Sequence, residues 1–382
     1  MATFKIGHLD FLCPKTMLIK IDNSLLECVG ANDPLILDRL RLCITHLLNA
    51  HREGRHFLLI DRDLSRSLKA MPGLSIDSIS MLKRLGQSST QYMNITSMVN
   101  TYCLVVNSDF FSASVDGLGS KVIRVPFAAM ANSCLSRETK FVAENLVDIE
   151  FYTKIALASF LPLGIRGLNI KFEPDMGGGS FTSVVYEKNQ IQNRFCFCVV
   201  DSDKYCPASC SGDTSQRLSR TNSTDSFLSD FCVIDTRTIE NLIPDNLIKL
   251  LSPDRLSVYA GLIDRFPFLR WHLHLREGLR LKDVIKGRII TQCDELKEFI
   301  LNDLFHGSNP CLNSDSCLEP SDCECIVFRG FGPAMLKECL KEMERTSNHK
   351  LFEMLSDSLR EKWLRLGLSL ISWGIAPKPT VT

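Results

Sequence analysis

The amino-acid sequence predicts an α/β protein whose strands pair mainly in parallel. Short apolar runs of strand length alternate with longer segments whose apolar residues have helical spacing. The run Arg194–Val200 has a continuous apolar core, which is typical of a strand covered on both faces. Together these two patterns favour parallel sheets flanked by helices.

Length and composition are those of a globular protein with more than one domain. The chain has 382 residues, of which 45% are hydrophobic, so each of two or three domains can bury its own core. Its 44 Lys and Arg balance its 44 Asp and Glu, which excludes a polycation. A nucleic-acid partner would therefore have to be bound by a local basic patch.

Cysteine usage and the lengths of the apolar segments indicate a reducing compartment. The 16 cysteines belong to a sizeable chain whose N-terminus, MATFKIGHLDFLCPK, lacks the pattern of a signal peptide. No apolar stretch approaches the roughly 20 residues that a membrane span needs. We therefore expect a soluble, cytoplasmic protein.

Residues 1–135 are expected to form an N-terminal α/β domain, whose role the sequence does not indicate. A stretch of helical period, Pro34–Leu48, precedes the strand-like run His56–Ile60. Two more strand-like runs follow, Thr101–Val106 and Lys121–Val125. This alternation predicts some parallel pairing.

Residues 138–250 have the clearest α/β pattern. Proline and glycine end the first expected helix, at Pro162 and Gly164. Residues 205–230 are rich in Ser, Thr and Asp without an apolar period, and are expected to form a surface loop. The expected strands are Phe141–Glu144, Leu168–Glu173, Arg194–Val200 and Phe231–Asp235, and the expected helices are Asn145–Leu161, Ser180–Gln192 and one opening at Arg237.

Residues 251–382 are expected to form a mainly helical C-terminal region. The stretch Lys350–Trp373 has the pattern of one long helix, and a cysteine-rich loop interrupts the region at 307–325. The cysteine spacings in this loop differ from the paired knuckles of structural zinc sites, so free thiols are favoured over zinc. The residues concerned are Cys311, Cys317, Cys323 and Cys325, with His306 nearby.

Acidic residues follow two of the expected strands of the central domain. Glu144 ends the first strand and Asp201 ends the third, and the carboxyl ends of parallel strands meet at one edge of a sheet. In an extended chain the side chain of Asp203 points to the same side as that of Asp201. Asp148 lies in the first turn of the helix after Glu144. The sequence therefore predicts several carboxylates at one sheet edge.

Carboxylates crowded in this way raise the pKa values of one another, and a divalent cation relieves their repulsion. Mg²⁺ is typically held by one or two carboxylates together with waters and substrate phosphates. Such an ion polarises a phosphodiester and generates hydroxide. The pattern thus points to phosphodiester hydrolysis with Mg²⁺ or Mn²⁺.

The order of these residues resembles the Toprim domain of topoisomerases, primases and OLD-family nucleases. The family pattern is a strand-end Glu and, at the end of a later strand, Asp-x-Asp; Glu144 and Asp201-Ser202-Asp203 match it. The resemblance covers residues 138–250. It implies that Glu144, Asp201 and Asp203 are catalytic metal ligands.

Further positions are similar to the OLD-like, phage-defence branch of that family. In FVAENLVDIEFY, Asp148 corresponds to the additional acid of this branch, and Asn145 stands where the family often has glycine. The glycine turn Gly177–Gly179 and the acidic Glu240 also match. The resemblance implies that Asp148 and Glu240 are further ligands or water-orienting groups.

The resemblance also implies what such a protein does and with what it acts. It implies a metal-dependent endonuclease for DNA or RNA, including tRNA, that acts as a bacterial anti-phage effector. The chain has no P-loop, so an ATPase or sensor would be a separate partner protein. An oligomer is possible.

A basic segment offers a candidate surface for nucleic acid. Residues 264–288 contain seven Lys or Arg against three Asp or Glu, interleaved with aromatic residues. A solvated helix face over a core aromatic cluster is the competing interpretation. The expected phosphate contacts are Arg276, Arg280 and Lys282, with Lys204 beside the acids.

Other interpretations stay open at this point. Asp201 and Asp203 could simply cap a turn, or the domain could be a non-catalytic scaffold that binds nucleic acid or protein. A topoisomerase- or primase-like activity is disfavoured, because the chain has six Tyr and no recognisable zinc ribbon. The pair Asp61 and Asp63 also follows a strand, but basic neighbours favour a structural role.

Overall fold

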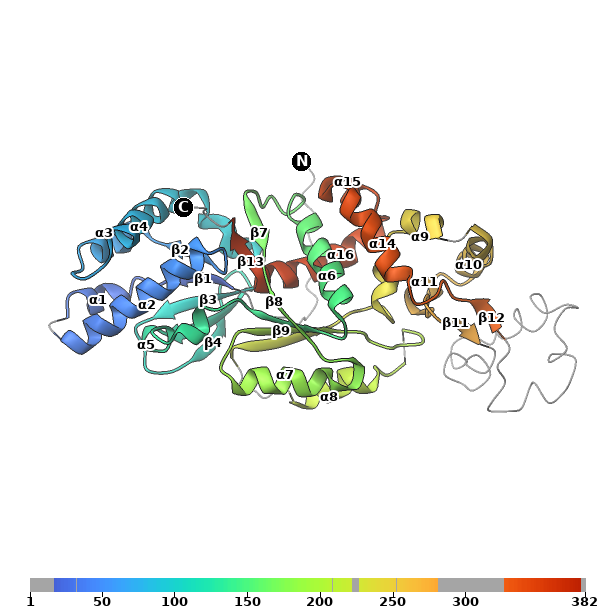
Figure 1. The fold of residues 1–382 in the computed structure, drawn as a ribbon, viewed down its shortest axis with the longest axis horizontal. Coiled ribbons are helices and arrows are strands. Elements are labelled where there is room, and N and C mark those ends of the chain that lie inside the picture. Colours follow the sequence, from blue (N-terminus) through green and yellow to red (C-terminus); the bar gives the residue numbers. More distant parts are fainter. Residues whose placement is uncertain are drawn as a thin grey trace, which may run out of the picture.

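The computed structural model describes residues 17–31, 33–207, 209–221, 227–251, 253–280 and 326–378, and it confirms the α/β class with mainly parallel sheets. The N-terminal unit, the central sheet and the segment around α9 to α11 follow one another along the long axis of the molecule (Figure 1). No helix within these ranges is both long and apolar enough to cross a membrane.

A five-stranded sheet in the order β2-β1-β3-β5-β4 organises the N-terminal unit, and only β4 is antiparallel to its neighbour. The helix Pro34–Arg52 begins where the sequence provides a cap, since the Asp33 carboxylate accepts the Leu35 N–H at 2.8 Å and Pro34 occupies the first turn. The strands are β1 (Leu18–Ile21), β2 (Phe57–Ile60), β3 (Thr101–Val106), β4 (Ser112–Val115) and β5 (Lys121–Pro126), and the helices are α1 (Leu25–Val29), α2 (Pro34–Arg52), α3 (Arg62–Lys69), α4 (Ile76–Ser88) and α5 (Phe127–Met130).

The central sheet is parallel throughout, in the order β10-β9-β6-β8. Every residue of β9 is buried: Phe197 and Val199 pack into the main core on one face, and Cys196, Cys198 and Val200 pack into a smaller cluster on the other. The strands are β6 (Lys140–Ala143), β8 (Glu173–Met176), β9 (Cys196–Val200) and β10 (Ser229–Val233).

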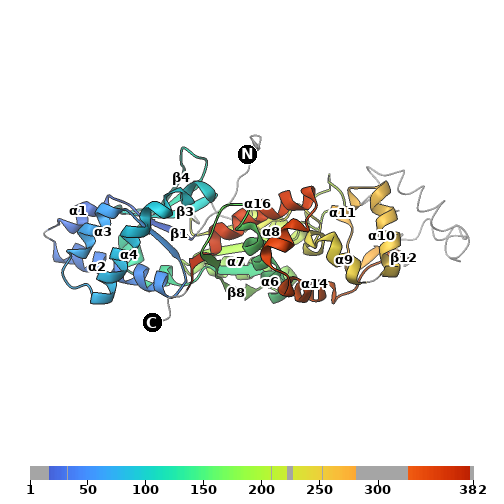
Figure 2. The same ribbon diagram turned by 90° about the horizontal axis from the view of Figure 1, so that it is seen from above.

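Helices cover both faces of this sheet. Helix α6 (Leu146–Ser159) contributes buried residues to the main core. Helices α7 (Thr182–Ile191) and α8 (Asp213–Thr221) lie together on the other face, where Tyr186 and Leu218 complete the smaller cluster (Figures 1 and 2). The central unit therefore has three layers, with the sheet between two layers of helices.

Two sequence-based expectations for the central region are wrong. The strand expected at Leu168–Glu173 is divided, because β7 (Leu168–Ile170) pairs antiparallel with β13 (Ile375–Pro377) and only β8 joins the central sheet. The expected loop 205–230 contains α8, whose one large apolar residue, Leu218, is fully buried. A single apolar residue gives no period that could reveal a helix.

The C-terminal part is mainly helical within its described residues, with one antiparallel pair of strands, β11 and β12. The long helix expected at Lys350–Trp373 is two helices, because the Ser356 hydroxyl accepts the Leu359 N–H and starts a new one. The helix expected at Arg237 is the short 3₁₀ turn η5 (Ile239–Leu242). The other elements are α9 (Asp245–Leu251), α10 (Pro253–Arg265), α11 (Leu269–His272), β11 (Gly278–Arg280), β12 (Ile326–Arg329), α14 (Met335–Arg345), α15 (Asn348–Glu353) and α16 (Asp357–Gly374).

Helix α16 packs against α6 and joins the two larger sheets. The helices approach closely at Gly367, where a Cβ atom would lie 2.2 Å from the Ser159 hydroxyl oxygen. The Trp373 ring stacks on Phe197 of the central sheet with centroids 5.5 Å apart. Its neighbour Ser372 accepts backbone N–H groups from the N-terminal unit, at Met17 and, at 3.2 Å, at Asn100. The last described helix therefore links both units.

Candidate functional site

The carboxyl edge of the central sheet brings the predicted acidic residues together. Strands β6 and β9 are parallel, with Val142 opposite Cys198, so Glu144 lies beside the end of β9 and next to Asp201. Strand β10 lies on the other side of β9, with Val233 opposite Val200. The two acids that follow β6 and β9 therefore share one edge, as parallel topology requires.

Asp201 has the most strongly perturbed carboxyl group of this edge. Burial raises its pKa well above the usual range, and the charges of Glu240 and Glu144 raise it further. Asp148 and Asp203 act in the same direction. The carboxylates therefore lie close enough to oppose one another's ionisation.

The pKa of Glu144 is also raised by crowding, and one nearby positive charge opposes this effect. Burial and the charge of Asp203 raise its pKa, and Glu240 adds to this. The guanidinium of Arg276 acts in the opposite direction. Arg276, expected from the sequence as a phosphate contact, is thus the basic residue that faces Glu144.

A glycine turn fixes the backbone at Glu144. The Gly177 and Gly178 N–H groups donate to the carbonyls of Ala143 and Glu144, each at 3.0 Å. Gly178 has a φ of +63°, in the left-handed region that favours glycine. A Cβ on Gly177 would lie 2.1 Å from the Thr182 Cα, so only glycine allows α7 to begin this close. The turn therefore positions Glu144 as well as α7.

Asp148 has a structural role as well as a place in the acidic cluster. Its Oδ2 accepts the Asn145 N–H at 3.0 Å and completes a capping box of α6. Burial raises its pKa to about 7, against the opposing effect of that hydrogen bond. Asn145 has an extended backbone, with φ −135°, so the glycine that the family often has here is not required.

Asp203 differs from the sequence-based expectation. Its φ is +54°, so the chain is not extended here, and the argument that placed Asp203 on the same side as Asp201 is wrong. The Asp203 N–H donates to the Arg237 carbonyl at 2.9 Å, and the Arg237 guanidinium opposes the burial that raises the pKa of Asp203. Asp203 remains part of the cluster through its effect on Glu144.

Glu240 is buried on η5, and its charge reaches the sheet edge. It raises the pKa values of Asp201, Asp148 and Glu144. All five predicted acids therefore belong to one electrostatic cluster. We call Glu144, Asp148, Asp201, Asp203 and Glu240 the acidic edge.

The sequence-based reasoning missed two residues of this neighbourhood. Tyr152 is fully buried on α6, and burial together with the charge of Asp201 raises its pKa. Its position one turn after Asp148 is a signal that could have found it. Arg237 is buried and its guanidinium lies 4.1 Å from the centre of the Tyr205 ring. No local pattern distinguishes it from other arginines.

The expected basic contacts have different positions. Arg276 faces the acidic edge, and Lys204 lines a pocket beside it. Arg280 lies exposed on strand β11. Lys282 falls outside the described residues, as do Cys311, Cys317, Cys323, Cys325 and His306 of the cysteine-rich loop.

Asp61 and Asp63, the acidic pair after β2, have the structural role that their basic neighbours led us to expect. The Asp61 carboxylate caps α3 through the Asp63 N–H at 2.8 Å, and Asp63 forms an ion pair with Arg66 at 2.9 Å. An acid does stand at the neighbouring strand end, which the sequence did not reveal. It is Asp22, which follows β1 and accepts the Ser24 N–H.

Within the described ranges, no group of three or more His, Cys, Asp or Glu side chains is arranged to hold a metal ion. The donor set of the acidic edge is nevertheless of the type that Mg²⁺ takes, since this ion needs only one or two carboxylates and completes its shell with water and substrate oxygens. A bound cation would relieve the mutual repulsion of these carboxylates, so the raised pKa of Asp201 agrees with a metal at this edge.

Comparison with family models, with curated proteins and with solved structures yields no match to this chain.

Proposed function

We propose that this protein is a Toprim-like nuclease that hydrolyses phosphodiester bonds with Mg²⁺ or Mn²⁺ at the acidic edge. One observation carries the proposal: at the carboxyl edge of the parallel sheet, burial and the charges of neighbouring carboxyl groups raise the pKa values of Glu144, Asp148 and Asp201. Structural caps do not need such crowding, because isolated carboxylates cap turns and helices equally well.

In this proposal Glu144, Asp201 and Asp203 hold the metal, and Asp148 and Glu240 orient water or complete the site. The bound cation would supply a polarised phosphodiester and a hydroxide nucleophile at neutral pH. Buried surroundings strengthen the electrostatic contribution of the carboxylates, since the local dielectric constant is low. The glycine turn keeps Glu144 in place, which preserves the geometry that catalysis requires.

Two basic residues near the acidic edge favour a polyanionic substrate. Arg276 faces Glu144, and Lys204 follows Asp203 directly in the chain. Both could hold phosphates that flank the scissile bond. The local positive charge agrees with a chain whose net charge is zero.

The Toprim assignment and a role in anti-phage defence belong to the proposal and rest on the residue pattern. A strand-end Glu, a glycine turn and Asp-x-Asp follow one another on the parallel strands β6, β8 and β9. An ATPase or sensor on a separate chain completes this proposal, because the sequence has no P-loop.

Metal binding and cleavage together test the proposal. Plasmid DNA and total RNA are incubated with the protein in Mg²⁺, Mn²⁺ or EDTA, and Mn²⁺ binding is measured by calorimetry. We expect cleavage that depends on the metal. Glu144→Gln and Asp201→Asn should each reduce its rate by a factor of about 100 or more. Glu150→Gln is the matched control, since Glu150 is an exposed carboxylate on the same helix as Asp148.

The calorimetric measurement separates an inactive preparation from a wrong proposal. A protein awaiting its partner would still bind Mn²⁺ and lose this binding in Asp201→Asn. Wild-type protein that binds no divalent cation, or a variant that cuts as well as wild type, contradicts the proposal.

A further inference from the structure

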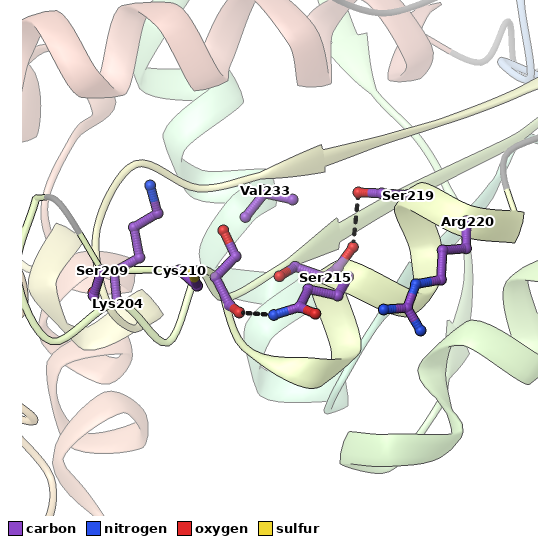
Figure 3. A pocket seen from close by; sticks show the side chains of 9 residues that line it. Lys204, Ser209, Cys210, Ser215, Ser219, Arg220 and Val233 are labelled. Carbon is purple, nitrogen blue, oxygen red and sulfur yellow. Dashed lines mark hydrogen bonds between the residues drawn. The ribbon is translucent and has the colours of Figure 1, made fainter. Parts of the chain in front are cut away.

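A pocket of about 580 Å³ opens beside the acidic edge, between the loop after Asp203 and helix α8 (Figure 3). It begins at Lys204, the residue after Asp203, and Val233 at the end of β10 forms part of its wall. The other lining residues are Ser209, Cys210, Ser211, Ser215, Gln216, Ser219 and Arg220. Its size is within the usual range for ligand pockets, roughly 300–1,000 Å³.

The loop that forms one wall is closed and anchored. The Gly212 N–H donates to the Ser202 carbonyl at 2.8 Å, which joins the two ends of the loop. The Lys204 carbonyl lies 3.0 Å from His272 Nδ1 on α11. The Lys204 backbone is therefore held from outside the loop, while its side chain lines the pocket (Figure 3).

Two cationic side chains stand at different parts of the wall. Figure 3 shows Lys204 at the loop and Arg220 on α8, with Ser215 and Ser219 between them. Lysine and arginine are the common donors to phosphate oxygens. The pocket is therefore suited to a ligand that carries phosphate.

Three serine hydroxyl groups of the lining donate their protons to backbone carbonyl groups. The hydroxyl of Ser209 donates to the Cys206 carbonyl at 2.8 Å, that of Ser215 to the Gly212 carbonyl at 2.8 Å, and that of Ser219 to the Ser215 carbonyl at 2.9 Å. The Gln216 amide N–H likewise donates to the Ser211 carbonyl, at 2.6 Å. A hydroxyl has one proton and two lone pairs, so these oxygens can accept a hydrogen bond from a ligand but have no proton left to donate.

Acceptors between two cations match a sugar phosphate whose sugar donates hydrogen bonds. A ribose 2′-hydroxyl is such a donor, whereas a deoxyribose has no group at this position. The described lining contains no aromatic ring on which a base could stack. The pocket therefore fits the backbone of RNA and gives no means of distinguishing the bases by stacking.

We infer that this pocket binds the ribose and phosphate of a nucleotide next to the scissile bond, so that the protein acts on RNA in preference to DNA. The inference rests on the proposed function, because it names the substrate of the same site. Lys204 and Arg220 contact phosphate, and Ser219 accepts the 2′-hydroxyl.

Binding to three matched oligonucleotides tests the inference without cleavage. Fluorescence anisotropy with Glu144→Gln protein in Mg²⁺ compares RNA, 2′-fluoro RNA and DNA of one sequence. The 2′-fluoro oligonucleotide has no proton to donate at the 2′ position. We expect RNA to bind about fivefold more tightly than either analogue, the effect of one hydrogen bond.

Variants of the lining separate the two kinds of contact. Ser219→Ala should abolish the preference for RNA and leave DNA binding unchanged. Lys204→Ala and Arg220→Ala should weaken all three oligonucleotides alike and reduce the salt dependence, by about 0.7 in the logarithmic slope per lost phosphate contact. Arg217→Ala is the control, because Arg217 is an exposed arginine on the same helix but outside the lining.

The outcomes for this inference and for the proposed function differ. Equal binding of RNA and 2′-fluoro RNA, or an RNA preference that Ser219→Ala retains, overturns the inference even if nucleic acid is cut. RNA-selective binding that depends on Ser219, in a protein that binds no divalent cation and cleaves no substrate, supports the inference and contradicts the proposed hydrolysis.

Discussion

Four neighbouring carboxyl groups and burial oppose the ionisation of Asp201, so the metal-free protein holds a destabilising group at its acidic edge. Removing such a group improves folding and abolishes function, as is common in active sites. We expect Asp201→Asn to raise the melting temperature in EDTA by several degrees, since one kcal/mol corresponds to roughly 2–4 °C in a domain of this size.

The same pair of proteins gives a prediction for metal addition. Mn²⁺ should stabilise the wild type by about 2.7 kcal/mol when its concentration is 100 times the dissociation constant. Asp201→Asn should gain nothing, because the proposed metal ligand is lost. Thermal scans with and without Mn²⁺ check this, and an equal gain in both proteins would show that the ion binds elsewhere.

The raised pKa of Asp148 leads us to expect that the protein becomes less stable as pH rises. Burial raises its pKa from 3.8 to about 7 in the folded state, so the folded protein binds the additional proton between these values. The stabilising contribution is complete below about pH 4 and is lost as pH rises through about 7. Urea unfolding in EDTA should therefore show wild type losing stability relative to Asp148→Asn over this interval, by a few kcal/mol at most. Parallel curves for the two proteins would contradict the shift.

The acidic edge was largely predictable from the sequence because it depends on strand ends. A residue directly after a parallel strand has a defined place, and this applies to Glu144 and Asp201. The position of Asp203 depends on a left-handed turn that the residue type only tolerates. Tyr152 lies one helical turn after Asp148 and could have been found, whereas Arg237 reaches the site through packing between distant segments, which local spacing does not encode.

At the scale of elements, the turn before α7 predicts an effect on activity. A Cβ at Gly177 would meet the backbone of Thr182, which cannot move without shifting α7. Gly177 also donates to the carbonyl beside Glu144. We expect Gly177→Ala to reduce cleavage by about 100-fold, the cost of a misplacement of roughly 1 Å. If the folded variant cleaves as fast as the wild type, the glycine turn does not contribute to the site.

The contact between α6 and α16 predicts a packing penalty. A methyl at Gly367 would collide with Ser159, so Gly367→Ala should cost about 1–3 kcal/mol. Ser159→Gly removes the atoms that collide and should recover part of this loss. The control is Gly261→Ala on α10, where the methyl meets nothing within 4 Å and higher helix propensity should stabilise by up to about 1 kcal/mol. Urea unfolding of the four proteins measures these differences.

Elements with a strong apolar period could be predicted, and those held by single contacts could not. Strand β9 was evident because all its residues are apolar and buried. Helix α8 could not be predicted because Leu218 is its one large apolar residue. The division between β7 and β8 depends on β13, which lies about two hundred residues further along the chain, so no window around Leu168 contains its cause.

At the scale of the whole molecule, Trp373 predicts that the two larger sheets unfold together. Its ring stacks on the central sheet, and Ser372 beside it binds the N-terminal unit. Trp373→Ala should lower stability by about 3–5 kcal/mol. Hydrogen exchange should show faster exchange in both β3 and β9, whereas loss of protection in only one sheet would mean that the units are independent.

The late position of α16 also affects how the protein is made. Ser159 and Trp363, which meet in the folded protein, are 204 positions apart. A ribosome adds about 5–20 residues per second, so α6 emerges tens of seconds at most before the helix that covers it. During that interval its apolar face has no cover and can attract chaperones.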